Sequence, residues 1–185
     1  MEKSDFETLI ERHYLRMRRA ALLLSGDAWE ADDLAQETFL QAMQSWHRFD
    51  PTTRVETWLY AILVNLDRKR RRTHVRAWRR IVIWLSRQDS QADRSPVEAA
   101  EVQEWRRGVW TEVALLPERQ QQAIVLRFAE GLSYEEIARA MECPVGTVKS
   151  RLHHGLNALK NKLGSKWSIQ IEQPSIRQSC CGETT

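Results

Sequence analysis

The chain has 185 residues, of which 42% are hydrophobic and 29% are charged, and its formal net charge is +3. This composition excludes a chain that is disordered throughout, and the length allows one ordinary domain or two small ones. The charge is unevenly distributed, because an acidic stretch at residues 27–37 precedes a basic one at residues 68–80. That asymmetry indicates more about binding partners than the net charge does.

Three further features limit the class of protein. Eight tryptophans against seven glycines and five prolines favour long elements with few turns, so we predict an all-α fold. Cys143, Cys180 and Cys181 give no disulfide framework, which favours a reducing cytoplasm. The amino terminus lacks the apolar core of a signal peptide, and no apolar stretch approaches the roughly 20 residues that a bilayer requires. We therefore expect a cytoplasmic protein that is neither exported nor membrane-spanning.

Helical periodicity dominates the first half of the chain. Apolar residues recur at intervals of three and four over residues 6–24 and again over residues 29–46. After a turn at residues 49–53, a third helix is expected to begin near Glu56 or Thr57. We assign residues 1–86 to a first domain. Residues 87–96 contain almost nothing to bury and are predicted to be a flexible linker.

In the second half, the residues that mark the ends of helices are easier to identify. Two helices are expected over residues 97–116 and 117–129, the second of them opened by Pro117. Gly131 is suited to end that helix in the left-handed conformation. The segment then continues into a helix pair, so we assign residues 97–164 to a second domain and expect residues 165–185 to form a disordered tail.

The helix pair has the features of a helix-turn-helix over residues 133–163. Ser133 and Glu136 fit a capping box at the start of the first helix. A turn at residues 142–144 interrupts that helix, and Pro144 can open the next one. Two small helical domains joined by a flexible linker, the second a helix-turn-helix domain, are therefore the predicted architecture.

The second helix of this pair is expected to present a polar outer face. Its apolar stripe turns the opposite side outward, and that side carries Lys149, Ser150, His153, His154 and Asn157. Lys149 and Arg151 can neutralise phosphates, whereas the other polar side chains can reach base edges in a major groove. Thr147 lies in the first turn, where backbone N–H groups favour a phosphate. The alternative is a solvated face on an ordinary helical hairpin.

The second half resembles a known family. The segments LPER and AIVLRF within residues 116–128, GLSYEEIA at 131–138 and VGTVKSRL at 145–152 are similar to the carboxy-terminal domain of extracytoplasmic-function (ECF) sigma factors of the sigma-70 family. The resemblance implies a domain that reads the -35 promoter element through Lys149, Ser150, His153 and His154. The chain departs from the family pattern at His153, His154 and Gly155, where relatives often have basic or aromatic residues.

The first half carries a second resemblance, which separates a sigma factor from LuxR-type response regulators. DDLAQETF at residues 32–39 resembles the sigma-factor helix that docks on a coiled coil of the polymerase largest subunit. By that resemblance the expected contacts to core polymerase are Asp33, Leu34, Gln36, Glu37 and Met43. An acidic and partly apolar face suits such docking, because charge steers the encounter and an apolar side chain anchors it. The acidic residues also complement the amino terminus of the helix.

Residues 49–65 resemble the family segment that opens the promoter at its -10 element, which implies DNA contacts at Phe49, Trp58 and Asn65. Opening requires that an unstacked base be captured, and stacking on an aromatic ring is worth about 1–3 kcal/mol per base. Core packing is the alternative role for both aromatic side chains, and we favour it for Trp58.

The basic run at residues 68–72 is expected to contact the phosphate backbone of the promoter. By the same resemblance its contact residues are Arg68, Lys69, Arg71 and Arg72. One alternative is a solvated last turn that complements the helix dipole. Another is a membrane-surface anchor formed with the apolar side chains Trp78, Ile81, Val82 and Trp84.

No catalytic, metal or cofactor motif is visible in the sequence, so we expect a non-enzymatic subunit without a cofactor. The resemblance implies a sigma factor that binds bacterial core RNA polymerase and promoter DNA, recognises -10 and -35 elements and helps to open the DNA. An anti-sigma factor, which could hold the chain at the inner membrane, is a further expected partner. The rivals are a dimeric operator-binding regulator and a metal-dependent nuclease. Cys180 and Cys181 are expected to be incidental, the alternative being a metal sensor with His153 or His154.

Overall fold

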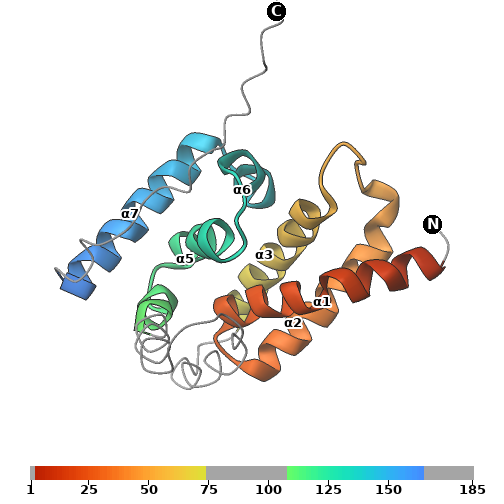
Figure 1. Cartoon of the computed structure of the whole chain (residues 1–185), viewed down its shortest axis with the longest axis horizontal. Helices are drawn as coiled ribbons and strands as arrows, with labels where there is room; N and C mark the ends of the chain where they lie inside the picture. Colours follow the sequence, from red (N-terminus) through yellow and green to blue (C-terminus); the bar gives the residue numbers. More distant parts are fainter. Residues whose placement is uncertain (1–2, 74–107, 165–185) are drawn as a thin grey trace, which may run out of the picture.

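The computed structural model describes residues 3–73 and 108–164, and over these residues every regular element is helical (Figure 1). This confirms the all-α prediction. The predicted linker and tail lie outside the described residues, as do residues 97–107 of the predicted fourth helix. The side chains of the proposed membrane anchor and the paired cysteines of the tail also lie outside them.

The first half is a three-helix unit. Helices α1 (Lys3–Ser25) and α2 (Ala28–Ser45) pack against each other after a turn in which Gly26 takes a φ of 74°. Asp27 caps α2 by accepting hydrogen bonds from the backbone N–H groups of Trp29 and Glu30. A short 3-10 turn, η1 (Trp46–Arg48), leads to α3 (Val55–Thr73), which packs on both earlier helices. All three predicted helices are therefore confirmed.

The second half contains the predicted helix-turn-helix. A helix at residues 108–114 is followed by α5 (Glu118–Ile124), a π-helical turn η3 (Val125–Ala129), α6 (Tyr134–Ala140) and α7 (Val145–Leu163). The capping box of α6 is present, since Ser133 N–H donates to Glu136 at 2.8 Å and Glu136 N–H donates to the Ser133 hydroxyl at 3.2 Å. Gly131 has the expected left-handed conformation, with a φ of 73°.

The end of the predicted helix over residues 117–129 differs from expectation. Its last five residues, η3, are wound as a π-helix, in which Glu130 N–H donates to the carbonyl of Val125 at 3.2 Å. Short π-helical segments are rare and concentrate at functional positions. Periodicity alone does not predict one, because it registers an apolar stripe and not the hydrogen-bond spacing. The consequence is that Glu130 is carried into the body of the molecule, where it is 4% exposed.

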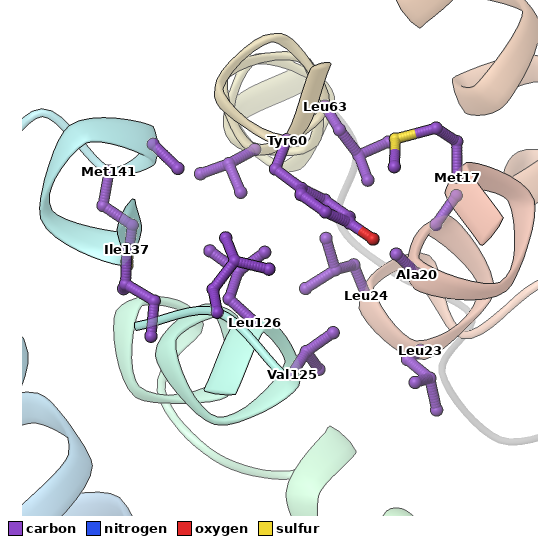
Figure 2. Close-up of a cluster of buried hydrophobic side chains, with 14 of the residues drawn as sticks. Met17, Ala20, Leu23, Leu24, Tyr60, Leu63, Val125, Leu126, Ile137 and Met141 are labelled. Carbon is purple, nitrogen blue, oxygen red and sulfur yellow. The ribbon is translucent and has the colours of Figure 1, made fainter. Parts of the chain in front are cut away.

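The two halves share one hydrophobic core, which the sequence did not predict. Helix α3 packs on α6, and α1 packs on η3, so that α5 and α6 lie between the first half and α7 (Figure 1). Figure 2 shows apolar side chains of both halves meeting there, namely Met17, Ala20, Leu23, Leu24, Tyr60, Leu63, Val125, Leu126, Ile137 and Met141. Each half thus buries apolar surface that it could not cover alone. In this conformation the second half is docked on the first.

Candidate polymerase and promoter interfaces

Helix α2 presents the acidic and partly apolar outer face that the sequence predicted. Asp33, Gln36 and Met43 are exposed along one side, with Met43 at 53%. The same side carries Leu40, which is 54% exposed and was not among the predicted contacts. Spacings of three and four residues bring these four side chains into one stripe. Leu40 could have been found from the pattern, because it lies four residues after Gln36 and three before Met43 and therefore falls on the same face of the helix.

Two of the predicted polymerase contacts on α2, Leu34 and Glu37, lie outside this exposed stripe. Leu34 is 1% exposed and belongs to the core, so its prediction as a polymerase contact is corrected to core packing. Glu37 is half-buried and forms an ion pair with Arg70 of α3 at 2.9 Å. The polymerase-facing helix is thereby joined to the basic end of α3.

An aromatic cluster closes the end of the first half beside the loop at residues 49–54. Phe49 packs against both Trp46 and Trp58, with ring centroids 5.0 and 5.1 Å away, and the two indoles also contact each other edge to face at 5.6 Å. Trp58 packs against the core, in agreement with the role favoured for it, while the ring of Phe49 is partly exposed. Trp46 was not among the predicted site residues. Its place in η1, directly before the loop, brings it into the cluster.

The loop beside this cluster has an ordered start. Asp50 accepts hydrogen bonds from the backbone N–H of Thr52 at 2.9 Å and from its hydroxyl at 2.7 Å. These two hydrogen bonds lower the pKa of the Asp50 carboxyl. The chain is therefore turned sharply at Pro51, which leaves the aromatic cluster at the edge of an exposed loop.

The basic face of α3 is divided between solvent and the second half. Lys69 is exposed, but Asn65 accepts a hydrogen bond from Arg68 at 2.9 Å and donates one to Glu142 of the helix-turn-helix turn at 3.1 Å. Arg71 has a side chain that is only 7% exposed. In this conformation Arg71 stabilises the fold through its ion pair with Asp67 and its hydrogen bond to Gln121. The prediction that Arg71 contacts a DNA phosphate is therefore corrected. The side chain of Arg72 lies outside the described residues.

The recognition helix α7 has the outer face that was predicted. Lys149, Ser150, His153 and His154 are exposed, and the opposite stripe at Val148, Leu152 and Leu159 is buried. The imidazole rings of His153 and His154 lie edge to face with centroids 5.7 Å apart. The side chain of Asn157 is 2.9 Å from His153, so it helps to orient that ring. Thr147 is half-buried in the first turn of the helix.

Arg151 has a different position from the one expected of a phosphate contact. Its guanidinium lies 3.2 Å from the Cys143 sulfur and 4.0 Å from the Met141 sulfur, so it braces the turn between α6 and α7. Gly155 also has a structural explanation. A Cβ atom there would lie 2.7 Å from the Cδ1 atom of Ile124 on α5, which explains the departure from the family pattern at this position.

Among residues 3–73 and 108–164, no group of three or more His, Cys, Asp or Glu side chains is arranged to hold a metal ion. Within the same ranges, no helix combines the length and apolar character that crossing a bilayer requires.

Both halves match known protein families. Residues 9–81 match the family described as Sigma-70 region 2, and residues 106–159 match Sigma-70, region 4. The chain is 36% identical over 177 residues to the ECF RNA polymerase sigma factor SigE of Mycolicibacterium smegmatis, which covers 91% of this chain and 65% of that relative. It is 32% identical over 185 residues to the RNA polymerase sigma-H factor of Pseudomonas aeruginosa, which covers 96% of this chain and 91% of that relative.

Solved structures show the same likeness. The sigma factor RpoE of Bartonella quintana, in complex with the anti-sigma factor NepR, matches with a TM-score of 0.65 and 27% identity over 86% of this chain and 96% of that chain. CnrH, in complex with the cytosolic domain of CnrY, matches with a TM-score of 0.62 and 25% identity over 88% of this chain and 89% of that chain.

A region 2 unit and a region 4 helix-turn-helix unit together define a transcription initiation factor of the sigma-70 type. The chain belongs to the family of ECF RNA polymerase sigma factors. It acts in promoter-specific transcription initiation by RNA polymerase.

Proposed function

We propose that the work of this sigma factor is divided among three surfaces of the described chain. The stripe of α2 at Asp33, Gln36, Leu40 and Met43 docks on core polymerase. The aromatic cluster, its loop and α3 engage the -10 element, and the outer face of α7 reads the -35 element. The observation that carries the proposal is the α2 stripe, because a helix-turn-helix protein that acts alone has no need of it.

Two features of that stripe support a docking role. Leu40 and Met43 are both more than half exposed although they lie three residues apart on one helix. Adjacent large apolar side chains on a surface mark protein interfaces, where such groups supply most of the binding energy. Asp33 beside them supplies a charge that guides encounter with a basic partner.

The aromatic cluster is suited to hold an unpaired base. A base that leaves the duplex loses its stacking, and a ring such as the partly exposed Phe49 can replace it at about 1–3 kcal/mol per base. Trp46 and Trp58 fix the orientation of that ring from two sides. Lys69 is exposed on the neighbouring helix, where it can neutralise a phosphate.

The outer face of α7 is suited to a major groove. Lys149 neutralises a phosphate, and Ser150, His153 and His154 have donors and acceptors that reach base edges. Arg151 acts as a positioning residue for this face, because it holds the turn that fixes the angle between α6 and α7. Thr147 lies in the first turn of the helix, where its hydroxyl can reach a phosphate of the DNA backbone.

The remaining partners follow from this division. RNA synthesis belongs to the polymerase, so the sigma factor contributes promoter choice and strand opening and no catalytic residue. An anti-sigma factor is a further partner, as in the solved complex of RpoE with NepR. The chain acts in the cytoplasm. An anti-sigma factor embedded in the inner membrane would hold the inactive chain at the membrane surface.

The test combines transcription with a matched pair of variants. Purified chain added to bacterial core polymerase should yield promoter-specific run-off transcripts from genomic fragments. Leu40→Ala with Met43→Ala should weaken core binding by about tenfold or more, measured by competition for labelled chain. Leu15→Ala is the control, because Leu15 of α1 is 75% exposed and lies outside the stripe. Equal core binding by the double variant and the wild type, or no transcript from any fragment, would refute the proposal.

A further inference from the structure

The outer face of α7 carries a hydrogen bond between two polar side chains that bears on how this helix recognises bases. The Nδ2 atom of Asn157 lies 2.9 Å from the Nε2 atom of His153, which is one helical turn earlier. Both side chains are exposed. Helix α7 lies at the outer edge of the molecule, with α5 and α6 packed against its other side (Figure 1). The two side chains are therefore accessible to a DNA duplex as a pair.

The chemistry of this hydrogen bond determines which nitrogen of His153 carries the proton. An amide nitrogen has two N–H groups and accepts no hydrogen bond, so Asn157 donates and Nε2 of His153 accepts. A neutral imidazole has one donor and one acceptor nitrogen, so its proton then lies on Nδ1. The nitrogen that this hydrogen bond leaves available to DNA is therefore Nδ1, and it is a donor.

No charged neighbour competes with Asn157 for the imidazole. The charged side chains of α5 and α6, with the one that lies a turn earlier on α7, are Glu118, Arg119, Glu135, Glu136, Arg139 and Lys149. Within residues 3–73 and 108–164, His153 forms no ion pair and no hydrogen bond other than that with Asn157. The ring of His154 contacts it edge to face at 5.7 Å, which limits its rotation. The Asn157 amide is therefore the group that selects the tautomer.

The four bases differ in what they offer such a donor in the major groove. Guanine presents N7 and O6 and thymine presents O4, which are all acceptors, whereas cytosine presents only the N4 donor. Adenine presents one acceptor and one donor. An imidazole with its proton on Nδ1 can therefore bond to guanine or thymine and not to cytosine. An imidazole whose Nδ1 is bare has the opposite preference.

We propose that Asn157 is a positioning residue that sets the base preference of α7: it holds Nε2 of His153, so that Nδ1–H selects guanine or thymine over cytosine at the base that this ring contacts. The inference rests on the proposed reading of the -35 element by α7. Asn157 acts through the imidazole and not by touching DNA. The two side chains work as one unit, in which the amide decides what the ring recognises.

The tautomer can be measured without DNA. In the full chain labelled with nitrogen-15 histidine, two-bond proton–nitrogen correlation spectra at about pH 9, where imidazoles are neutral, distinguish a protonated Nδ1 from a protonated Nε2. His153→Gln identifies the signals of His153 among the five histidines. The wild type should carry the proton on Nδ1, and Asn157→Asp should move it to Nε2, because a carboxylate only accepts. A proton on Nε2 in the wild type would overturn the inference.

The binding test compares duplexes that differ at one base pair. A selection from randomised duplexes gives the preferred site, and the base at which His153→Ala loses preference is the one that the ring contacts. At about pH 9 the wild type should bind guanine or thymine there about fivefold more tightly than cytosine, as one net hydrogen bond provides. Asn157→Asp should prefer cytosine. At about pH 6 the ring gains a proton and both nitrogens donate, so Asn157→Asp should return to the wild-type preference.

Asn161→Asp is the matched control, because it adds the same charge at an exposed position of α7 that lies two turns from His153. It should weaken binding to all duplexes alike and leave the base preference unchanged at both pH values. Lys149→Ala should lower the affinity for every duplex. If neither Lys149→Ala nor His153→Ala alters binding, α7 does not read the -35 element and both proposals fail. A loss in Lys149→Ala with a wild-type preference in Asn157→Asp at about pH 9 would refute this inference alone.

Discussion

Replacement of Gly155 by alanine tests how α7 is held on α5. A Cβ atom at this position would lie 2.7 Å from Cδ1 of Ile124, whereas carbon atoms in contact prefer about 3.5–4.0 Å. Ile124 is 2% exposed, so its side chain has little room to yield. Overpacking of this kind costs about 1–3 kcal/mol, and the better helix propensity of alanine offsets about 1 kcal/mol. We expect Gly155→Ala to lower the free energy of unfolding by about 1 kcal/mol.

Removal of the Cδ1 atom of Ile124 tests whether this atom is what obstructs a methyl group at position 155. Ile124→Val deletes Cδ1 and on its own should cost about 0.5–1.5 kcal/mol. In that background the added methyl group has space, so only the gain in helix propensity remains and Gly155→Ala should become stabilising. Urea unfolding followed by circular dichroism, applied to the wild type, both single variants and the double variant, measures the coupling. Additive effects of the two substitutions would refute the steric argument.

Three further predictions follow. Burial lowers the pKa of His13, against the opposing effect of Glu56, so the unfolded chain takes up a proton below about pH 6.5 while the folded chain resists it. Stability measured by urea unfolding should therefore fall as the pH drops below that value, and less steeply in His13→Gln. Ser133→Ala removes one half of the capping box and should cost about 1 kcal/mol in the same assay. His154→Ala should change base preference at the -35 element in a selection from randomised duplexes, whereas Arg151→Ala should lower thermal stability and weaken binding to all sequences alike.

Each of these predictions has an outcome that contradicts it. Parallel pH profiles for the wild type and His13→Gln would show that another group carries the dependence. Unchanged stability of Ser133→Ala would mean that water replaces the cap. A uniform loss of affinity in His154→Ala would exclude this side chain as a base reader, and full thermal stability of Arg151→Ala would remove its role in holding the turn.

Local structure was predictable from the sequence wherever it depends on residues within a single helix. The inward stripes of α1, α2 and α7 and the capping box at Ser133 follow from periodicity and from short-range hydrogen bonding, and the structure confirms them. The exposed positions of Lys149 and His154 follow from the same stripe on α7. Errors arose where the family resemblance, and not the periodicity, assigned the contacts, as when buried Leu34 was expected to touch core polymerase and exposed Leu40 was left out.

The contacts between the halves were not predictable in this way. Arg71 belongs to a run of adjacent cations, and nothing in its sequence neighbourhood separates it from exposed Lys69. Its partner Gln121 lies 50 positions further along the chain, so only the tertiary arrangement determines that Arg71 is buried. Glu130 is similar, because the π-helical winding that directs it inward leaves no trace in the apolar pattern.

The exposure of α7 has a consequence for how promoters are found. Lys149 and its neighbours on the outer face are open to solvent in the same conformation in which Asn65 is held by Glu142. In this conformation α7 therefore presents its whole outer face to duplex DNA, whereas α3 presents only part of its basic face. So few phosphate contacts give weak binding that is sensitive to salt, which allows a protein to hop and slide between sites. Search by α7 alone would be rapid, and long residence would begin only where α3 is also engaged.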